Sequence, residues 1–310
     1  SGAGKSTLGL AAMGYTQPGC RITEGEIIFD GVDLAKLSDE GKRKFWGDRM
    51  TYVAQSAAAS FNPAHRLIAQ TTASTIRAGI KDRKSAYDDA KQLYRALNLP
   101  DPDHIGDRYP HQVSGGQLQR VMTAMAMSPR PDLLVFDEPT TALDVTTQVE
   151  VLASMRSIVE EFNTAAIYIT HDLAVVAQMA DTIKVLRHGY EVEEAPTRQM
   201  LSAPEQPYTK SLWSVRALEK SQQAVQASVL SLQGIDASYG VQKVLHNVNI
   251  EVPKGSTVAV VGESGSGKST TARVITGLLP QTFGSVKFNG EDLPPALADR
   301  SKDQKRRIQM

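Results

Sequence analysis

The chain has 310 residues, 41% of them hydrophobic, so it is long enough for one large globular domain or two. Its 34 basic and 34 acidic side chains cancel, which leaves no global field that would favour nucleic acid or an anionic membrane surface. The single cysteine, Cys20, excludes an internal disulfide framework and fits a reducing compartment. Because no apolar run approaches the ~20 residues of a membrane-spanning helix, we expect any membrane association to come through a partner.

A glycine-rich loop occurs twice, as Ser-Gly-Ala-Gly-Lys-Ser-Thr at residues 1–7 and as Ser-Gly-Ser-Gly-Lys-Ser-Thr at residues 264–270. In such a loop the glycines let backbone N–H groups approach phosphates, the lysine reaches the outer phosphates, and a hydroxyl holds Mg²⁺. The sequence therefore predicts two ATP sites, with Ser6 and Ser269 as metal ligands. The predicted nucleotide contacts in the loops are Gly2, Gly4, Lys5, Ser6, Thr7, Gly262, Ser264, Gly265, Gly267, Lys268, Ser269 and Thr270.

The two copies differ in what surrounds them. The first begins inside the motif and without an initiator methionine, so we expect a fragment cut within the first loop. The second follows an apolar run at residues 258–261, which predicts a buried parallel strand, and a helix is expected from Lys268.

The repeat extends beyond the loops, because residues 25–34 match residues 284–293. Each stretch predicts a strand closed by an Asx-Gly turn. Further along, residues 49–52 align with residues 307–310, so only the opening of a second copy is expected in this chain.

Between the loops the pattern predicts an α/β core. Strands are expected at residues 50–54, 133–136 and 165–169, with a helix over about 146–162. Ala90, Leu93, Tyr94 and Leu97 at helical spacing predict a helical subdomain over about 64–110. The remaining expectations are a hairpin over 183–192 that turns at His188-Gly189, a first domain over 1–212, a polar linker over 213–227 and a second domain over 228–310.

Two carboxylates, Asp137 and Glu138, follow the apolar run at 133–136. Open α/β sheets place their ligands at the carboxyl ends of strands. Asp137 suits Mg²⁺, bound directly or through an intermediary, and Glu138 is placed to orient or deprotonate an attacking water. Without the upstream glycine-rich loop, an ordinary acidic strand end would explain the pair equally well.

Ser114-Gly115-Gly116-Gln117 precedes a helix-forming run that ends before Pro129. Ser114 can cap that helix, whose N-terminus then offers an anion site. Residues 110–120 resemble the signature motif of ATP-binding cassette (ABC) proteins, with Val113 where leucine is usual. The resemblance makes Ser114, Gly115, Gly116 and Gln117 nucleotide contacts.

Further motifs resemble the same family in the expected order. Gln55 resembles the Q-loop glutamine, residues 137–140 the second Walker motif, residues 141–144 the D-loop with Asp144, and His171 the switch histidine. The resemblance implies catalytic roles for Glu138, His171 and Gln55, with Gln55 also at the metal. Tyr239 matches the aromatic that stacks on adenine.

The implied fold class is α/β, a P-loop NTPase domain of the ABC type. It consists of a parallel core sheet, an antiparallel β subdomain and a helical subdomain. The N-terminal part of a second such domain is expected to follow.

Residues 203–212, Ala-Pro-Glu-Gln-Pro-Tyr-Thr-Lys-Ser-Leu, are similar to a segment of dipeptide, oligopeptide and nickel importer ATPases, some of which join two cassettes on one chain. This resemblance implies ATP and Mg²⁺ as cofactors, membrane permease subunits as direct partners, contacted through Gln55 and residues 61–110, and a solute-binding protein as an indirect one. It also implies a peripheral place on the cytoplasmic side of the cell membrane and no nucleic-acid partner.

In this family two cassettes close head to tail, so Ser114, Gly115 and Gly116 would face the second loop and Tyr239. Neither site would then be complete within these residues, and the chain alone is expected to show little or no steady-state ATPase activity. The alternatives are a soluble tandem cassette ATPase acting on ribosomes, which would need a long charged linker, and a DNA-repair ATPase, which would need a coiled-coil insertion. Peptide, nickel and glutathione-like solutes all stay open.

Overall fold

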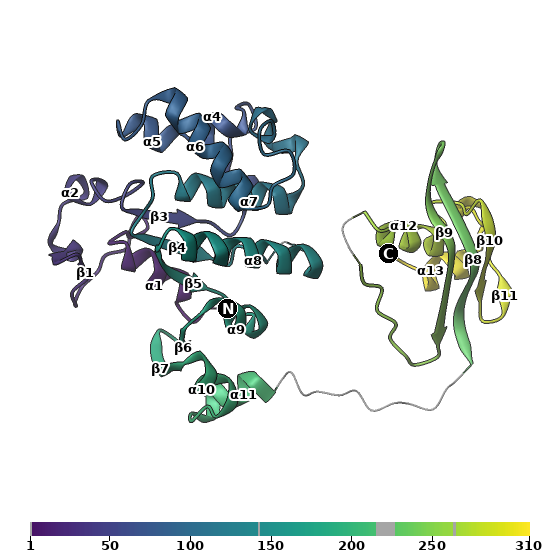
Figure 1. The fold of residues 1–310 in the computed structure, drawn as a ribbon. Helices are drawn as coiled ribbons and strands as arrows, with labels where there is room; N and C mark the ends of the chain where they lie inside the picture. Colours follow the sequence, from purple (N-terminus) through teal and green to yellow (C-terminus); the bar gives the residue numbers. More distant parts are fainter. Residues whose placement is uncertain (1, 142, 215–226, 263–264) are drawn as a thin grey trace. The chain divides into compact units, whose positions relative to one another are not determined.

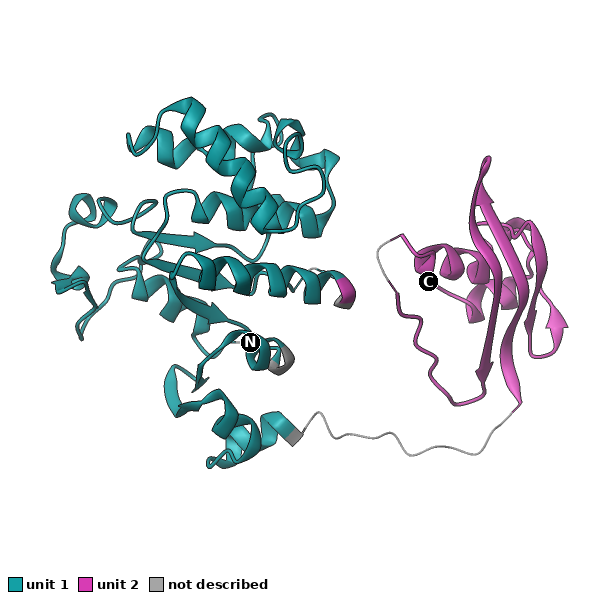
Figure 2. Cartoon of the chain, viewed as in Figure 1, with its two compact units in different colours: residues 1–143, 147–218 teal, residues 144–146, 219–310 magenta. Residues whose placement is uncertain are grey.

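A parallel sheet of three strands organises the first of two structural units in the computed structural model, which describes residues 2–141, 143–214, 227–262 and 265–310 (Figure 1). The units comprise residues 1–143 with 147–218, and residues 144–146 with 219–310 (Figure 2). Residues 215–226 of the expected linker lie outside the described residues. Its positions 213 and 214 belong instead to helix α11 (Pro207–Ser214).

The parallel sheet has the order β3-β4-β5, with β4 in the centre. The strands are β3 (Met50–Val53), β4 (Leu133–Asp137) and β5 (Ala165–Ile169). Met50 lies opposite Leu133, which lies opposite Ala165. The three predicted strands are therefore confirmed, and the sheet brings their carboxyl ends to one edge.

Helix α1 (Lys5–Ala12) covers one face of this sheet and contacts β4 and β5. Its Gly9 permits the close approach, since a Cβ there would lie 2.3 Å from Ile169 Cδ1 and 3.2 Å from Val135 Cγ1. The core on this face contains Met13, Leu34, Met50, Val135 and Ile169.

Helices α7 (Gly115–Met127) and α8 (Val145–Glu161) build the core on the other face. Successive side chains of β4 point to opposite faces of the sheet, so Leu134 and Phe136 face these helices, whereas Leu133 and Val135 lie on the α1 side. The first turn of α7 lies close to α8, because a Cβ on Gly116 would lie 2.3 Å from Thr147 Cγ2. Both faces of the sheet are thus covered, as a parallel sheet requires.

The predicted helical subdomain is present and packs on α7. Ala90, Leu93, Tyr94 and Leu97 are all fully buried in it, as their spacing predicted. Buried Arg120 of α7 donates to the carbonyl oxygens of Leu97 and Asn98, at 3.4 and 2.8 Å. The elements are α3 (Ala57–Ser60), α4 (Leu67–Thr71), α5 (Ala73–Arg77), α6 (Arg83–Ala96), η2 (Ile105–Asp107) and η3 (Pro110–Gln112).

Two hairpins complete the strands of this unit. β1 (Ile28–Phe29) and β2 (Val32–Asp33) join at Asp30 and Gly31, whose positive φ angles of 49° and 77° form the predicted turn. They lead into η1 (Leu34–Lys36) and α2 (Asp39–Arg43).

The second hairpin lies after α9 (Leu173–Met179). β6 (Thr182–Arg187) and β7 (Tyr190–Pro196) turn at His188-Gly189, with φ angles of 51° and 81°, as predicted. The Gly189 N–H donates to the carbonyl oxygen of Ala3 at 3.1 Å, which fixes the turn beside the first glycine-rich loop.

The Pro-Tyr-Thr segment forms a folded extension of that hairpin, with α10 (Thr197–Ser202) and α11. The Glu193 carboxylate of β7 accepts hydrogen bonds from the backbone N–H groups of Glu205 and Gln206, at 2.7 and 3.1 Å. The guanidinium of Arg187 lies 4.7 Å from the ring centre of Tyr208. The strands and the N-terminus of α11 are therefore joined by charge and ring contacts as well as by apolar packing.

The second unit contains an antiparallel sheet of order β11-β10-β8-β9. Asn289 and Gly290, with φ angles of 52° and 86°, form the predicted turn between its last two strands. The expected helix from Lys268 is also confirmed. The elements are β8 (Ser228–Tyr239), β9 (Gln242–Pro253), α12 (Lys268–Thr276), β10 (Phe283–Phe288), β11 (Glu291–Asp292), η5 (Leu297–Asp299) and α13 (Lys302–Arg307).

The strand expected at residues 258–261 is not formed, which corrects that prediction. Val258, Val260 and Val261 are 42%, 48% and 86% exposed. A strand needs the main-chain groups of a neighbour, and among the described residues of this unit no strand pairs with this run. The apolar run predicted a strand, but its sequence could not show that a neighbouring strand is missing among the described residues of this unit.

Within the part of the chain that the structure describes, no helix is both long enough and apolar enough to cross a bilayer.

Gly9→Val tests the contact between α1 and the sheet. The added side chain meets Val135 and Ile169, so we expect a loss of about 1–3 kcal/mol in the free energy of unfolding from overpacking. Thermal and urea melts of the chain measure it. Leu8→Val is the matched control, because Leu8 is 49% exposed on the same helix and should change stability by about 0.5 kcal/mol or less. Equal melts for the two variants would contradict the close approach.

Candidate nucleotide site

The first glycine-rich loop leads directly into the N-terminus of α1. Gly2 and Gly4 have positive φ angles of 81° and 88°, a conformation that glycine adopts without steric cost. Gly4 is the N-cap, and no hydrogen bond from a described side chain caps this end of the helix. Its first N–H groups therefore remain available to an anion, with the helix dipole in their favour.

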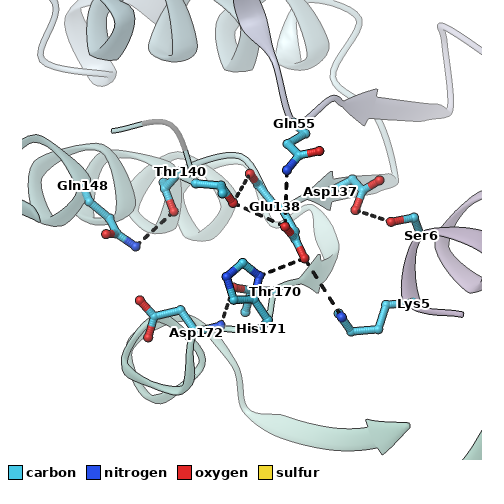
Figure 3. Close-up of polar contacts among 11 residues, drawn as sticks. Lys5, Ser6, Gln55, Asp137, Glu138, Thr140, Gln148, Thr170, His171 and Asp172 are labelled. Carbon is cyan, nitrogen blue, oxygen red and sulfur yellow. Dashed lines mark hydrogen bonds and ion pairs between the residues drawn. The ribbon is translucent and has the colours of Figure 1, made fainter. Parts of the chain in front are cut away.

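Asp137, at the end of β4, joins the sheet to this loop (Figure 3). The Ser6 hydroxyl donates to Asp137 Oδ1 at 2.9 Å, and the Tyr52 hydroxyl donates to Asp137 Oδ2 at 2.6 Å. The Asp137 residue is 8% exposed, so its carboxylate is held in a largely buried place. Burial, followed by the hydrogen bond to Asp137, raises the pKa of Tyr52 and keeps its hydroxyl protonated as a donor.

The other predicted catalytic residues, Gln55 and His171, contact the Glu138 carboxylate (Figure 3). Its Oε1 lies 3.0 Å from His171 Nδ1 and 4.0 Å from Lys5 Nζ. Its Oε2 accepts a hydrogen bond from Gln55 Nε2 at 3.4 Å. Lysine, glutamine and histidine come from three separate stretches of sequence, and the sheet edge brings them together.

The backbone of Glu138 has a positive φ of 47°, uncommon for a residue other than glycine. Its N–H donates to the Ile169 carbonyl oxygen at 2.9 Å, and its own carbonyl accepts from Thr141 Oγ1 at 3.2 Å. These contacts hold the turn after β4. Sparsely populated backbone of this kind often occurs at functional sites.

Opposing effects set the ionisation of Glu138. Burial favours the neutral acid, but the hydrogen bond and charge of His171, together with the charge of Lys5, lower the pKa of the Glu138 carboxyl overall. Glu138 is therefore an anion near neutral pH, as a residue that accepts a proton from water must be.

The residues present fit a magnesium nucleotide. Within the described residues no group of three or more His, Cys, Asp or Glu side chains could hold a metal by itself. Mg²⁺, however, is usually held by one or two protein oxygens together with substrate phosphates. Ser6 and Asp137 supply such oxygens beside the uncapped end of α1, and Gln55 lies on Glu138 close by.

The signature segment starts α7 as its sequence predicted. Ser114 Oγ accepts from the Gln117 N–H at 3.3 Å, and Gln117 Oε1 accepts from the Ser114 N–H at 3.0 Å, which is a capping box. Ser114 and Gly115 are exposed, whereas Gly116 is buried. The D-loop lies between β4 and α8, and its Asp144 directly precedes α8. Gln148 of α8 donates to Thr140, the residue before the D-loop, at 3.2 Å.

The second glycine-rich loop has the same local form. Gly262, Gly265 and Gly267 have φ angles of 150°, 86° and 96°, and Gly267 is the N-cap of α12. Lys268 Nζ donates to the Gly262 carbonyl oxygen at 2.8 Å. Ser269 is exposed, as is its counterpart Ser6, whereas Thr270 is buried and its counterpart Thr7 is exposed. Ser264 lies outside the described residues.

Tyr239 ends β8 in the second unit and is 42% exposed. Arg273 Nη1 of α12 donates to the Tyr239 hydroxyl at 2.8 Å. This hydrogen bond, followed by one from Thr270, lowers the pKa of Tyr239. The ring is thus tied to the helix that follows the second loop.

Two residues with contacts in the first site were missing from the predicted set. Tyr52 reaches Asp137, and Thr141 Oγ1 lies 3.4 Å from Glu138 Oε2. The Thr141 contact follows from its place three residues after Glu138. Tyr52 could be placed only with the strand register, which sets it opposite Val135.

The sequence profile of the family described as ABC transporter matches residues 1–141 and 245–310. The chain belongs to this family.

The curated relatives of this ABC transporter chain include glutathione import ATP-binding proteins GsiA. The protein of Salmonella typhimurium (strain LT2) is 32% identical over an alignment that covers 100% of this chain and 57% of the relative. That of Pectobacterium atrosepticum is 33% identical, with 94% and 54% covered. The chain therefore spans a little over half the length of these relatives.

Solved ABC structures share its fold. A dimeric bacterial ABC transporter cassette, MJ0796, is 26% identical with a TM-score of 0.55, and the match covers 64% of this chain and 82% of the cassette. CbiO1 of Clostridium perfringens, part of an ABC transporter complex, is 22% identical with a TM-score of 0.57 over 66% and 76% of the two chains. The expected α/β P-loop NTPase fold of the ABC type is thereby confirmed.

His171→Ala tests the electrostatics around Glu138. The change removes the hydrogen bond and charge that oppose burial, so the pKa of Glu138 should rise. A ¹³C NMR titration of the glutamate carboxyls measures this. Gln55→Ala is the control, since its amide contact is long, at 3.4 Å. An unchanged Glu138 titration in His171→Ala would contradict the described contact.

The same shift links Glu138 to stability. Because its pKa is lowered in the folded chain, ionised Glu138 stabilises the fold at neutral pH. That contribution is lost as the pH falls through the folded-state pKa.

Proposed function

We propose that the chain is part of an ATP-binding and ATP-hydrolysing subunit that powers import of a small solute through a membrane permease. The observation that carries the proposal is the convergence of Lys5, Gln55 and His171 on Glu138, beside the Ser6–Asp137 pair. Phosphoryl transfer to water needs these parts: a cation for the phosphates, oxygens for a metal, and a base for the water.

Each of these residues then has one task. The N–H groups at the start of α1 and Lys5 bind the outer phosphates, and Ser6, supported by Asp137 and assisted by Gln55, holds the metal. Mg²⁺ supplies charge neutralisation on the transferred phosphoryl group when it is bound. Glu138 accepts the proton of the attacking water, and His171 holds the carboxylate in place.

The second loop supplies the corresponding parts of another site. Lys268, Ser269, Thr270 and the glycines 262, 265 and 267 would bind phosphates there, with Ser264 completing the loop, and Tyr239 would stack on the base. We propose that Ser114, Gly115, Gly116, Gln117 and Asp144 contribute across a pair of cassettes, as the family resemblance implies. Each site would then need two cassettes.

The partners follow from the relatives. Because the relatives are named glutathione import ATP-binding proteins, the partners proposed here are integral permease subunits, with a solute-binding protein reached indirectly. The solute proposed is a small peptide of the glutathione kind. The place of action is the cytoplasmic side of the membrane, without insertion. No observation favours the ribosome-acting alternative. In the sequence, the Pro-Tyr-Thr segment and a short neutral stretch stand where such proteins usually have a long charged linker.

Glu138→Gln, made in the transporter that carries this chain, tests the catalytic assignment. The amide cannot take the proton of water, so turnover should fall by about 10²–10⁴-fold while nucleotide affinity is kept. Phosphate release measures turnover, and mant-ATP binding measures nucleotide affinity. Glu160→Gln is the matched control, because Glu160 is an exposed partner of Arg156 on α8. Undiminished turnover in Glu138→Gln would refute the assignment.

Import is tested separately in proteoliposomes that contain this subunit with the permease and the binding protein of its transporter. We expect ATP-dependent uptake of radiolabelled glutathione or a dipeptide, lost with Glu138→Gln. ATP hydrolysis without uptake of either solute would leave the ATPase assignment standing and refute the proposed solute class.

A further inference from the structure

Both oxygens of the Asp137 carboxylate are taken by hydroxyl groups. Oδ1 accepts from Ser6 at 2.9 Å, and Oδ2 accepts from Tyr52 at 2.6 Å. Among the described residues, no other side chain hydrogen-bonds to this carboxylate. Since the Asp137 residue is only 8% exposed, Tyr52 is the group that satisfies its second oxygen.

The strand register places Tyr52 for this contact. Tyr52 lies opposite Val135 in the parallel pair, and side chains two residues apart on a strand point to the same face. Asp137 is therefore on the same face as Tyr52, about 7 Å further along the sheet. A tyrosine is long enough to cross that step, whereas a shorter side chain at the same position is not.

Packing alone does not account for the hydroxyl. The Tyr52 ring lies against the apolar cluster that contains Met50, Val135 and Ile169. Phenylalanine would fill the same volume. The hydroxyl group is the part that reaches beyond the cluster to the loop side of the sheet.

We propose that Tyr52 is a positioning residue of the metal site. Its hydroxyl fixes the rotation of the Asp137 carboxylate, so that Oδ1 stays on Ser6, the hydroxyl assigned to Mg²⁺ above. The inference rests on the proposed ATPase function. The terminal torsion of aspartate is broad, so a carboxylate held at one oxygen only can turn away from its partner. Residues that orient a metal ligand from behind commonly change metal affinity when they are removed.

The test measures metal binding and does not depend on turnover. Mn²⁺ replaces Mg²⁺ and is titrated by electron paramagnetic resonance in the presence of a non-hydrolysable ATP analogue. All variants carry Lys268→Ala, which removes the lysine of the second loop. We expect Tyr52→Phe to weaken Mn²⁺ binding by about tenfold and to leave analogue binding in EDTA unchanged.

Tyr94→Phe is the matched control. It removes a buried, hydrogen-bonded tyrosine hydroxyl, that of the Thr71–Tyr94 pair, in the helical subdomain. It should lower thermal stability comparably and leave Mn²⁺ binding unaltered. Equal Mn²⁺ affinities for Tyr52→Phe and Tyr94→Phe would overturn the inference.

Two further variants separate the possible failures. Ser6→Ala should abolish metal-dependent tightening of analogue binding, and if it does not, the proposed site itself fails. In an Asp137→Asn background, Tyr52→Phe should cause no additional loss, because it acts through that carboxylate. Full additivity of the two changes would show that Tyr52 does not act through Asp137 and would refute the proposal even if Tyr52→Phe alone binds Mn²⁺ weakly.

Discussion

The parallel pairing of β4 with β3 and β5 is the constraint on which the candidate site depends. It sets Val135 opposite Tyr52 and Asp137 opposite Ile169, so the ends of three strands meet at one edge. Asp137 ends β4 at that edge and Glu138 follows it, on the side where α1 begins. Apolar packing against α1 on one face and α7 and α8 on the other keeps the register, because a shift of one residue would exchange the two faces.

Close approach of helices to this sheet and to one another is obtained with glycines in specific places. Gly9 lets α1 lie against Ile169 and Val135, and Gly116 lets α7 begin against Thr147 of α8. The same short distances bring Ser6 within 2.9 Å of Asp137 and Lys5 within 4.0 Å of Glu138. Packing and chemistry are thus linked: a larger residue at Gly9 would displace the loop residues together with the helix.

The carboxylates at the strand end have distinct environments despite being neighbours in sequence. Asp137 is largely buried and held by two hydroxyls, which suits a fixed supporting role. Glu138 is partly accessible and surrounded by Lys5, Gln55 and His171, and its pKa is lowered by His171 and Lys5 against the effect of burial. This difference in surroundings supports the proposed roles, in which Asp137 supports the metal and Glu138 accepts the proton.

Much of this arrangement could be predicted from the sequence, because the motifs carry local geometry. The glycine-rich loops, the Asx-Gly turns at 30–31 and 289–290, the capped start of α7 and the apolar strands all depend on residues near in sequence. Contacts between strands could not be predicted, because the register of two strands and the distance that a side chain must span depend on two segments at once. Tyr52 was missed for that reason, and the apolar run at 258–261 was expected to be a strand although no described strand of its unit pairs with it. The sequence by itself determined the family motifs and local elements; tertiary structure decided which side chains meet, because hydrogen bonds between strands require a partner that only folding supplies.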